Sequence, residues 1–287
     1  MAQDQLDIRR MTPSDLDFAF HLVSGESWDM SRKELERLLA YEPEGCFVAE
    51  QRGERTGIVT TTSYGPLAWV GNSIVEPARR GRGTGAVLMQ HAMQYLQEKG
   101  VETIRLDAEQ KAVPLYRRLG FVEECRSLRF QGTGLRYAPE TADRMEASHL
   151  EDVMALDARI FGADRSRILR QAFEDFPGLA FVSCALGELV GYIMARPIAN
   201  GGKVGPWVSQ PGELGEHRAR FLLREVLNAF HGQPVSVGVL ENNPASQDIL
   251  KKHGFRELPC SLRMRLGNDR YRSEAPGEFA IGSPAKG

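Results

Sequence analysis

The sequence has no long hydrophobic run and no excess of either charge. No apolar stretch approaches the roughly 18 residues of a membrane-spanning helix, and the opening MAQDQLDIRR lacks the apolar core of a secretion signal. The 36 Lys and Arg residues balance 38 Asp and Glu residues, which gives a formal net charge of −2. Because general nucleic-acid binding requires a basic excess, we expect neither a membrane nor a nucleic acid as a partner.

Cysteine is scarce as well, and no two cysteines form a CxxC pair. Cys46, Cys125, Cys184 and Cys260 lie far apart in the sequence. This spacing favours free thiols in a reducing cytoplasm over disulfides or a zinc site. We therefore expect a cytoplasmic protein that holds no metal ion.

The sequence does contain an internal repeat. Its 287 residues, 42% of them hydrophobic, are enough for two globular domains. Gly120-Phe121 recurs as Gly254-Phe255, and Phe47-Val48 recurs as Phe181-Val182. Both offsets are the same, because 254 − 120 and 181 − 47 each equal 134. A fixed offset of this kind predicts two copies of one fold.

Each copy shows the same succession of elements. A capped helical segment comes first, followed by a strand pair, a third strand, an amphipathic helix, a fourth strand, a short helix and a last strand. This alternation predicts an α/β fold of the mixed α+β type. We expect one domain over residues 1–133 and the other over residues 140–287. The joint QGTGLRYAPETAD contains Gly132, Gly134 and Pro139, which interrupt the periodicity.

A polar tail follows the second copy. From Asn268 onward it is rich in Gly and Pro, which predicts a mobile segment. Within the tail, the stretch EFAI (278–281) has the composition to pair as an edge strand.

A glycine-rich turn lies between the third strand and the amphipathic helix of the first copy, in IVEPARRGRGTG (74–85). Its glycines allow successive backbone N–H groups to turn toward one concavity, and the helix that begins near Thr84 adds the positive end of its dipole. Arg79, Arg80 and Arg82 add positive charge beside the turn. Together these features predict a pyrophosphate site.

Other phosphate motifs fit this turn less well. A Walker-A loop requires Lys-Ser/Thr after its glycines, and none follows here. A dinucleotide fingerprint is a closer match, because Gly81, Gly83 and Ala86 fit G-x-G-x-x-A and Asp107 could bind a ribose. That motif turns tightly off its strand, however, whereas a Pro and two Arg residues follow Val75 here. A glycine-rich turn with solvated arginines is the remaining alternative.

Two motifs of the first copy resemble a known family. VxPxxRGRGTG (75–85) looks like the acetyl-CoA loop of the GCN5-related N-acetyltransferases, the GNAT superfamily, and YxxxGF (116–121) looks like the downstream motif of that family. The resemblance implies that the strand backbone and the loop hold the cofactor through Ile74, Val75, Arg80, Gly81, Arg82, Gly83, Thr84 and Gly85. It also implies that Tyr116 is the general acid that protonates the departing CoA thiolate.

The same resemblance implies the fold and the reaction. We expect two tandem GNAT-like domains, each with a mostly antiparallel central sheet flanked by helices. The expected reaction moves an acetyl group from the co-substrate acetyl-CoA directly to a primary amine of a small molecule or peptide, and the enzyme would be a monomer or a homodimer. Glu109 departs from the family, which commonly has Asn there. No general base is evident, since Glu26, Asp29 and Glu109 are more typical of solvated carboxylates.

The second copy resembles a degenerate form of the first. At an offset of 134, Gly83 becomes His217 and Tyr116 becomes Leu250, so that the phosphate turn and the acid are both lost. We expect this half to complete the acceptor pocket or to stabilise the first domain. Because no base is evident, the alternative function for the chain is an acetyl-CoA-binding sensor with little turnover.

Overall fold

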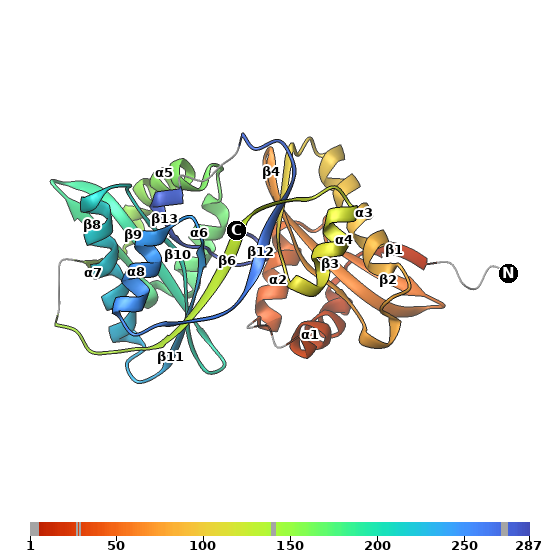
Figure 1. The fold of residues 1–287 in the computed structure, drawn as a ribbon, viewed down its shortest axis with the longest axis horizontal. Helices are drawn as coiled ribbons and strands as arrows, with labels where there is room; N and C mark the ends of the chain where they lie inside the picture. The colour runs from red at the N-terminus through yellow and green to blue at the C-terminus, as the bar shows by residue number, and fades with distance from the viewer. Residues whose placement is uncertain (1–5, 27, 29, 139–141, 271–274) are drawn as a thin grey trace. The chain divides into compact units, whose positions relative to one another are not determined.

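The computed structural model describes residues 6–26, 28, 30–138, 142–270 and 275–287. Its contacts divide the chain into two compact units (Figure 1). The first unit comprises Met1–Glu124, Arg263–Asn268 and Lys286, and the second comprises Cys125–Leu262, Asp269–Ala285 and Gly287.

The first half of the chain supplies most of the first unit. Its elements are β1 (Leu6–Arg10), η1 (Pro13–Asp15), α1 (Leu16–Gly25), α2 (Arg32–Tyr41), β2 (Phe47–Gln51), β3 (Glu54–Tyr64), β4 (Leu67–Val75), η2 (Pro77–Arg79), α3 (Thr84–Glu98), β5 (Thr103–Ala108), η3 (Gln110–Ala112), α4 (Val113–Arg118) and β6 (Val122–Thr133). The sheet of this unit has the order β1-β2-β3-β4-β5 and ends with part of β12. Antiparallel pairs join β1 through β4, whereas β4 and β5 are parallel.

The second half repeats this plan. Its elements are β7 (Asp143–Arg144), η4 (Ala147–His149), α5 (Leu150–Phe161), α6 (Ser166–Asp175), η5 (Pro177–Leu179), β8 (Ala180–Ala185), β9 (Glu188–Ile198), β10 (Gly201–Ser209), α7 (Glu213–Ala229), β11 (Pro234–Leu240), α8 (Pro244–Lys252), β12 (Arg256–Gly267), η6 (Ala275–Gly277) and β13 (Glu278–Ala280). β10 and β11 are parallel, whereas β6–β11, β9–β10, β8–β9 and β7–β8 are antiparallel. Both sheets are therefore mostly antiparallel and are flanked by helices, as the sequence predicted (Figure 1).

The repeat found in the sequence extends to the bounds of the strands. β9, β10 and β12 have the bounds of β3, β4 and β6 shifted by 134 residues. This agreement over three strands confirms that the two halves are copies of one fold.

The two copies exchange their last strands. Residues Ser127–Thr133 of β6 pair with Pro234–Leu240 of β11, so the end of the first copy completes the sheet of the second unit. In return, Arg263–Gly267 of β12 belongs to the first unit, whose sheet it closes beside β5. Because β6 and β12 are equivalent by the repeat, either strand has the pattern to fill either position. The division into domains 1–133 and 140–287 stays a prediction, and the two compact units cross it.

The joint predicted around Gly132 is in part a strand. Gly132 lies in β6, and a Cβ at this position would come within 2.7 Å of the Phe255 ring. The glycine therefore serves close packing against an aromatic ring and not a turn. Pro139, also assigned to the joint, lies outside the described residues.

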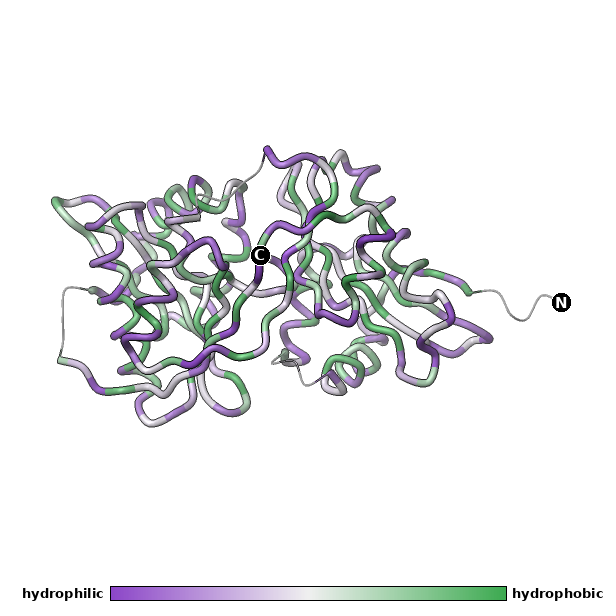
Figure 2. The backbone as a smooth tube through the Cα atoms, in the orientation of Figure 1, coloured by the Kyte–Doolittle hydropathy of each residue, from purple (hydrophilic) through white to green (hydrophobic). Residues whose placement is uncertain are grey.

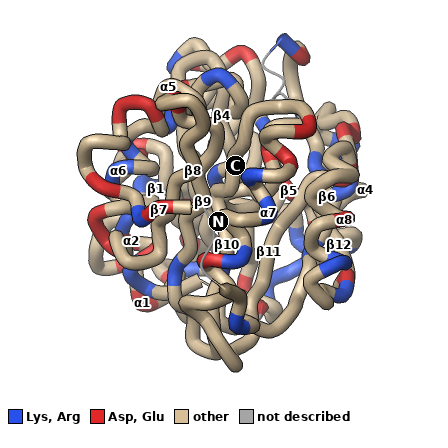
Figure 3. The backbone as a smooth tube through the Cα atoms, turned by 90° about the vertical axis from the view of Figure 1, so that its left-hand side faces the viewer, with Lys and Arg blue, Asp and Glu red and all other residues tan. Residues whose placement is uncertain are grey.

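Amphipathic helices cover the sheet of each unit. In the first unit, α1 and α2 bury Leu16, Leu22, Leu35 and Leu38 in a cluster that includes Ile58 of β3. Figure 2 shows the matching alternation of hydrophobic and hydrophilic residues along the helices. In Figure 3, cationic and anionic residues are interspersed along the backbone, in keeping with the small net charge.

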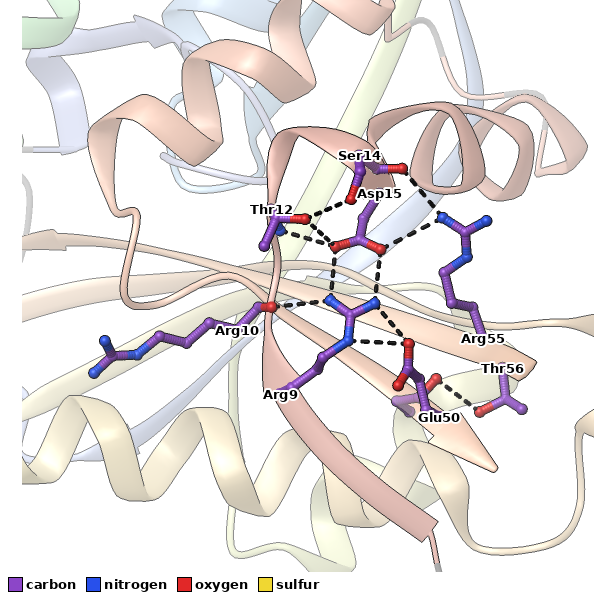
Figure 4. A network of polar contacts seen from close by, with 9 residues as sticks. Arg9, Arg10, Thr12, Ser14, Asp15, Glu50, Arg55 and Thr56 are labelled. Atoms are coloured by element: carbon purple, nitrogen blue, oxygen red, sulfur yellow. Dashed lines mark hydrogen bonds and ion pairs between the residues drawn. The ribbon is translucent and has the colours of Figure 1, made fainter. Parts of the chain in front are cut away.

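A buried carboxylate fixes the turn between β1 and α1 (Figure 4). The Arg9 guanidinium donates to both oxygens of Asp15, at 2.7 and 2.8 Å, and the Thr12 amide donates to the same carboxylate at 2.9 Å. Arg9 also donates to Glu50 of β2. The Arg9 hydrogen bonds are the largest cause that holds the pKa of Asp15 well below its ordinary range, although burial opposes them.

Replacing Asp15 with Asn should destabilise the protein in a pH-dependent way. The folded pKa of Asp15 lies below the unfolded value of about 3.9, so its stabilisation is present above pH ~4 and is lost as the pH falls through the folded pKa. We expect a loss of about 1–3 kcal/mol at pH 7, because Arg9 loses its charge partner. Urea unfolding at pH 7 and pH 3 measures the effect.

Asp17 provides the control for this experiment. It is 84% exposed and pairs with Arg32, so Asp17→Asn should change stability by less than about 0.5 kcal/mol. A stability difference between native and Asp15→Asn protein that stays equal at pH 7 and pH 3 would contradict the assignment.

Candidate functional site

Strand β4 of the first unit separates from its parallel neighbour β5 halfway along. The β4–β5 pairing covers only Leu67–Trp69 on β4. Beyond it a β-bulge shifts the register against β3, and Asn72 within the bulge has a φ of 48°. The Asn72 amide donates to the Thr60 hydroxyl at 3.0 Å, which fixes this uncommon conformation. The remainder of β4 is thereby free of β5.

The glycine-rich turn follows this separated end of β4. Gly81 has a φ of 77° and Gly83 has a φ of 88°, values that favour glycine. A Cβ at either position would meet no atom within 4 Å. The two glycines are therefore required by backbone conformation, and the space above them is open.

The backbone amides of the turn are available to a ligand. From Gly81 to Gly85, no amide donates a backbone hydrogen bond to any residue that the structure describes. The same stretch leads into α3, whose N-terminus carries the positive end of the helix dipole. Successive free N–H groups at a helix start can hold an anion, so this arrangement is compatible with the predicted pyrophosphate site.

The three arginines of the turn do not contribute equally. Arg79 forms an ion pair with Glu54, and Arg80 forms one with Glu26 and donates to the Val75 carbonyl at 2.9 Å. Arg82 is exposed and has no ion pair within the described part of the chain. The positive charge expected of all three arginines is therefore partly neutralised by Glu54 and Glu26. Arg82 is the arginine of the turn whose charge is not paired with any carboxylate that the structure describes.

Tyr116 lies against the bulged part of β4. It comes from α4, is 8% exposed and is hydrogen-bonded to the side chain of Ser73. Burial raises the pKa of Tyr116, and the negative charge of Glu109 raises it further, whereas the Ser73 hydrogen bond lowers it. The phenol is therefore protonated at neutral pH and can donate a proton at this point of the strand.

A chain of charged groups surrounds Glu109. Its carboxylate accepts a hydrogen bond from the Trp28 indole at 2.7 Å and pairs with Lys111 at 2.9 Å. Lys111 also pairs with Glu26 at 2.8 Å, and Glu26 in turn pairs with Arg80 of the turn. Burial acts to raise the pKa of Glu26, but the hydrogen bonds from Lys111 and Arg80 outweigh burial and lower it.

Trp28 and Lys111 belong to no sequence motif, so the sequence alone does not identify them. Glu26 and Glu109, which are expected to be solvated carboxylates, both lie in this network. Asp29, the third carboxylate considered, lies outside the described residues.

Asp107 is not available to a dinucleotide ribose. Its carboxylate accepts from the Arg263 guanidinium at 2.8 Å, and its side chain is fully buried. This pairing removes the acidic ligand that the fingerprint reading of Gly81 and Gly83 requires.

The second unit has lost the cradle. Its equivalent helix α7 begins at Glu213, directly after Gly212, so the residues that would form the turn are already helical. A Cβ at Gly215 would come within 1.6 Å of the Gln210 carbonyl oxygen, so no open space lies above the backbone there. Leu250 takes the place of the tyrosine and is fully buried in the core.

Neither a metal-binding cluster nor a membrane-spanning helix occurs among the described residues. Among them, no group of three or more His, Cys, Asp or Glu side chains could hold a metal ion. The four cysteines are free thiols, and burial raises the pKa of Cys46 to about 12. Across the same residues, no helix has the length and apolarity needed to cross a bilayer.

Comparisons with known proteins show the family of the chain. The Acetyltransferase (GNAT) family model matches residues 12–121, and the Acetyltransferase (GNAT) domain model matches residues 153–277. Over 247 residues the chain is 24% identical to a holothin acyltransferase of Pseudoalteromonas sp. (strain SANK 73390), which covers 85% of this chain and 82% of that protein.

Solved structures share the fold over almost the whole chain. A putative acetyltransferase from Pyrococcus horikoshii has a TM-score of 0.83 at 24% identity, covering 98% of this chain and 96% of that one. A tandem GNAT protein from the clavulanic acid biosynthesis pathway has a TM-score of 0.63 at 14% identity, covering 92% and 98%. With a GNAT model matched in each half, the chain belongs to the GNAT acetyltransferase superfamily and carries two GNAT domains in tandem.

Proposed function

We propose that the first unit transfers an acetyl group from acetyl-CoA to a primary amine, and that the second unit is a non-catalytic copy. The observation that carries this proposal is the row of free amides from Gly81 to Gly85, which follows the end of β4, together with the buried phenol of Tyr116, which lies beside Ser73 of the same strand. Acetyl transfer from a CoA thioester requires a site for the CoA pyrophosphate and an acid for the departing thiolate, and the cradle after β4 and the Tyr116 phenol of α4 supply these two parts.

The cofactor is held by backbone groups. The amides of Gly81, Arg82, Gly83, Thr84 and Gly85 bind the pyrophosphate, and Arg82 approaches it from solvent. The backbone groups of Ile74 and Val75, in the part of β4 that has separated from β5, would hold the pantetheine arm. Arg80 stabilises the turn through the hydrogen bond that its guanidinium donates to the Val75 carbonyl.

The transfer is a direct attack. The amine nitrogen bonds to the thioester carbonyl carbon, and a backbone N–H of the bulged segment around Ile74 stabilises the oxyanion. The C–S bond then breaks, and the departing thiolate takes the proton of Tyr116. The phenol is afterwards restored by the proton that the new amide nitrogen releases.

Glu109 receives the acceptor. It is the carboxylate whose charge acts on Tyr116, and Trp28 and Lys111 fix its orientation. A carboxylate in this position attracts an ammonium group and takes its proton, directly or through water. A carboxylate in this role suits an acceptor that is a small amine or a peptide N-terminus. The four free thiols favour a reaction in the reducing cytoplasm.

Release of CoA thiol from acetyl-CoA across a panel of amines tests the proposal. The panel should contain polyamines, amino sugars, amino acids, peptides and holothin, the acceptor for which one relative is named. We expect amine-dependent thiol release with at least one class, together with saturable acetyl-CoA binding. Tight binding without turnover on any amine would favour an acetyl-CoA sensor, and absence of binding would overturn both functions.

A further inference from the structure

The C-terminal segment forms a strand inside the sheet of the second unit. β10 and β11 pair directly only at Gly202–Val204 and then separate. Beyond that point β13 pairs antiparallel with β10, at Trp207↔Ala280 and Val208↔Glu278. On its other side the Ile281 amide donates to the Gly238 carbonyl of β11 at 3.0 Å. EFAI therefore pairs as the sequence predicted, but it lies between β10 and β11 instead of forming an edge.

This gap is the counterpart of the cofactor position in the first unit. Subtracting 134 from 207 and 208 gives Ser73 and Ile74 of β4. These two residues lie in the part of β4 that has separated from β5, where we placed the pantetheine arm. The tail thus occupies in the second unit the position that the cofactor takes in the first.

Side chains of the second unit hold the tail through its backbone. The Asn243 amide donates to the Glu278 carbonyl at 2.9 Å, and the Ser246 hydroxyl donates to the Phe279 carbonyl at 2.5 Å. Phe279 is fully buried, with its ring centroid 5.1 Å from that of Trp207. The predicted mobility of the tail is therefore wrong for residues 278–281, which are 0–2% exposed.

Glycine residues on both flanking strands leave room for this segment. A Cβ at Gly205 would lie 2.1 Å from the Ile281 carbonyl oxygen. A Cβ at Gly238 would lie 3.0 Å from the Ile281 side chain. The absence of a side chain at Gly205 and Gly238 therefore allows β10 and β11 to approach Ile281 closely.

We propose that the gap between β10 and β11 is a peptide-binding slot, occupied by residues 278–281 of the chain itself. The slot offers backbone partners, the polar side chains of Asn243 and Ser246, and the Trp207 ring as an aromatic contact, which suit an extended peptide. It offers no phosphate cradle, because α7 already begins at Glu213. The comparison with pantetheine rests on the proposed function. The position of residues 278–281 between β10 and β11 does not depend on it.

Hydrogen exchange of the native chain tests the seating directly. The Ile281 amide should be protected to the level of the core amides of β10, because it bonds to Gly238 inside a sheet. Phe279→Ser should speed exchange at Ile281 at least about 100-fold, whereas Phe279→Leu, which keeps an apolar side chain, should change it less than about tenfold. An Ile281 amide that exchanges in native protein as fast as in an unfolded peptide would overturn the proposal.

Binding of a free peptide tests the slot itself. A synthetic peptide of residues 275–287 should bind the full-length Phe279→Ser chain and not the native chain, whose slot is filled. A peptide that carries the same Ser substitution should bind neither. Failure of the native peptide to bind the Phe279→Ser chain would overturn the peptide specificity.

Acetyl-CoA titration separates this proposal from the proposed function. One molecule per chain is expected for native and Phe279→Ser protein alike, since emptying the slot creates no cradle. Two molecules per Phe279→Ser chain would show that the slot accepts the cofactor and would overturn the proposal. No acetyl-CoA binding by native protein would instead refute the proposed function, while the exchange and peptide results would still decide the slot.

Discussion

Gly83→Asp is expected to lower the affinity for acetyl-CoA at least about 100-fold. The new carboxylate would project into the open space above the turn, where no protein atom lies within 4 Å of the Cβ. A pyrophosphate bound by the neighbouring amides would meet this charge at contact distance. Like charges brought together in this way cost several kcal/mol. Equilibrium titration with acetyl-CoA measures the loss.

The substitution should leave the fold of the first unit intact. Gly83 has a φ of 88°, a conformation that Asp and Asn tolerate better than other residues with a side chain. Because nothing contacts the new Cβ, the cost is limited to local backbone strain of about 1 kcal/mol.

Gly53→Asp is the matched control. Gly53 lies in the turn between β2 and β3, has a φ of 77° and also has nothing within 4 Å of its Cβ. The control therefore carries the same strain and the same added charge outside the cradle. Equal losses of affinity in Gly53→Asp and Gly83→Asp, or none in either, would reject the cradle as the cofactor site.

The cradle and the repeat could be predicted because both depend on local sequence. Gly81 and Gly83 adopt conformations that glycine alone adopts without strain, so their spacing specifies the turn before any tertiary contact forms. The repeat survives in the same way, because strand bounds follow from hydrophobic patterns that both copies retain.

Features that depend on pairing between distant segments could not be predicted. β6 and β12 carry equivalent patterns, so the sequence does not state which sheet each one completes. EFAI has the composition of a strand, but its partners β10 and β11 are set by Gly205 and Gly238, which look like ordinary loop and strand glycines. The contact between Trp28 and Glu109 could not be predicted for the same reason, since 81 residues separate them in the sequence.

Tyr116→Phe should lower kcat by about 100-fold or more while acetyl-CoA affinity changes less than about threefold. General acid catalysis contributes about 10²–10⁴-fold, and a phenylalanine has no proton to give to the thiolate. Phe fills nearly the same volume in this buried position, so the packing against Phe121, at 5.9 Å between ring centroids, is kept. Steady-state kinetics together with acetyl-CoA titration separate the two quantities.

Tyr95→Phe is the control. Tyr95 lies on α3, its hydroxyl donates to Glu42 at 2.6 Å, and it has no part in the proposed chemistry. Its kcat should stay within about twofold of native. The pH profile adds a second criterion: since the pKa of Tyr116 is raised above 10.0, native kcat should show no decline from loss of the acid below pH ~10. A Tyr116→Phe enzyme with native kcat would show that the thiolate leaves without this proton, and Tyr116 would then be a packing residue of α4.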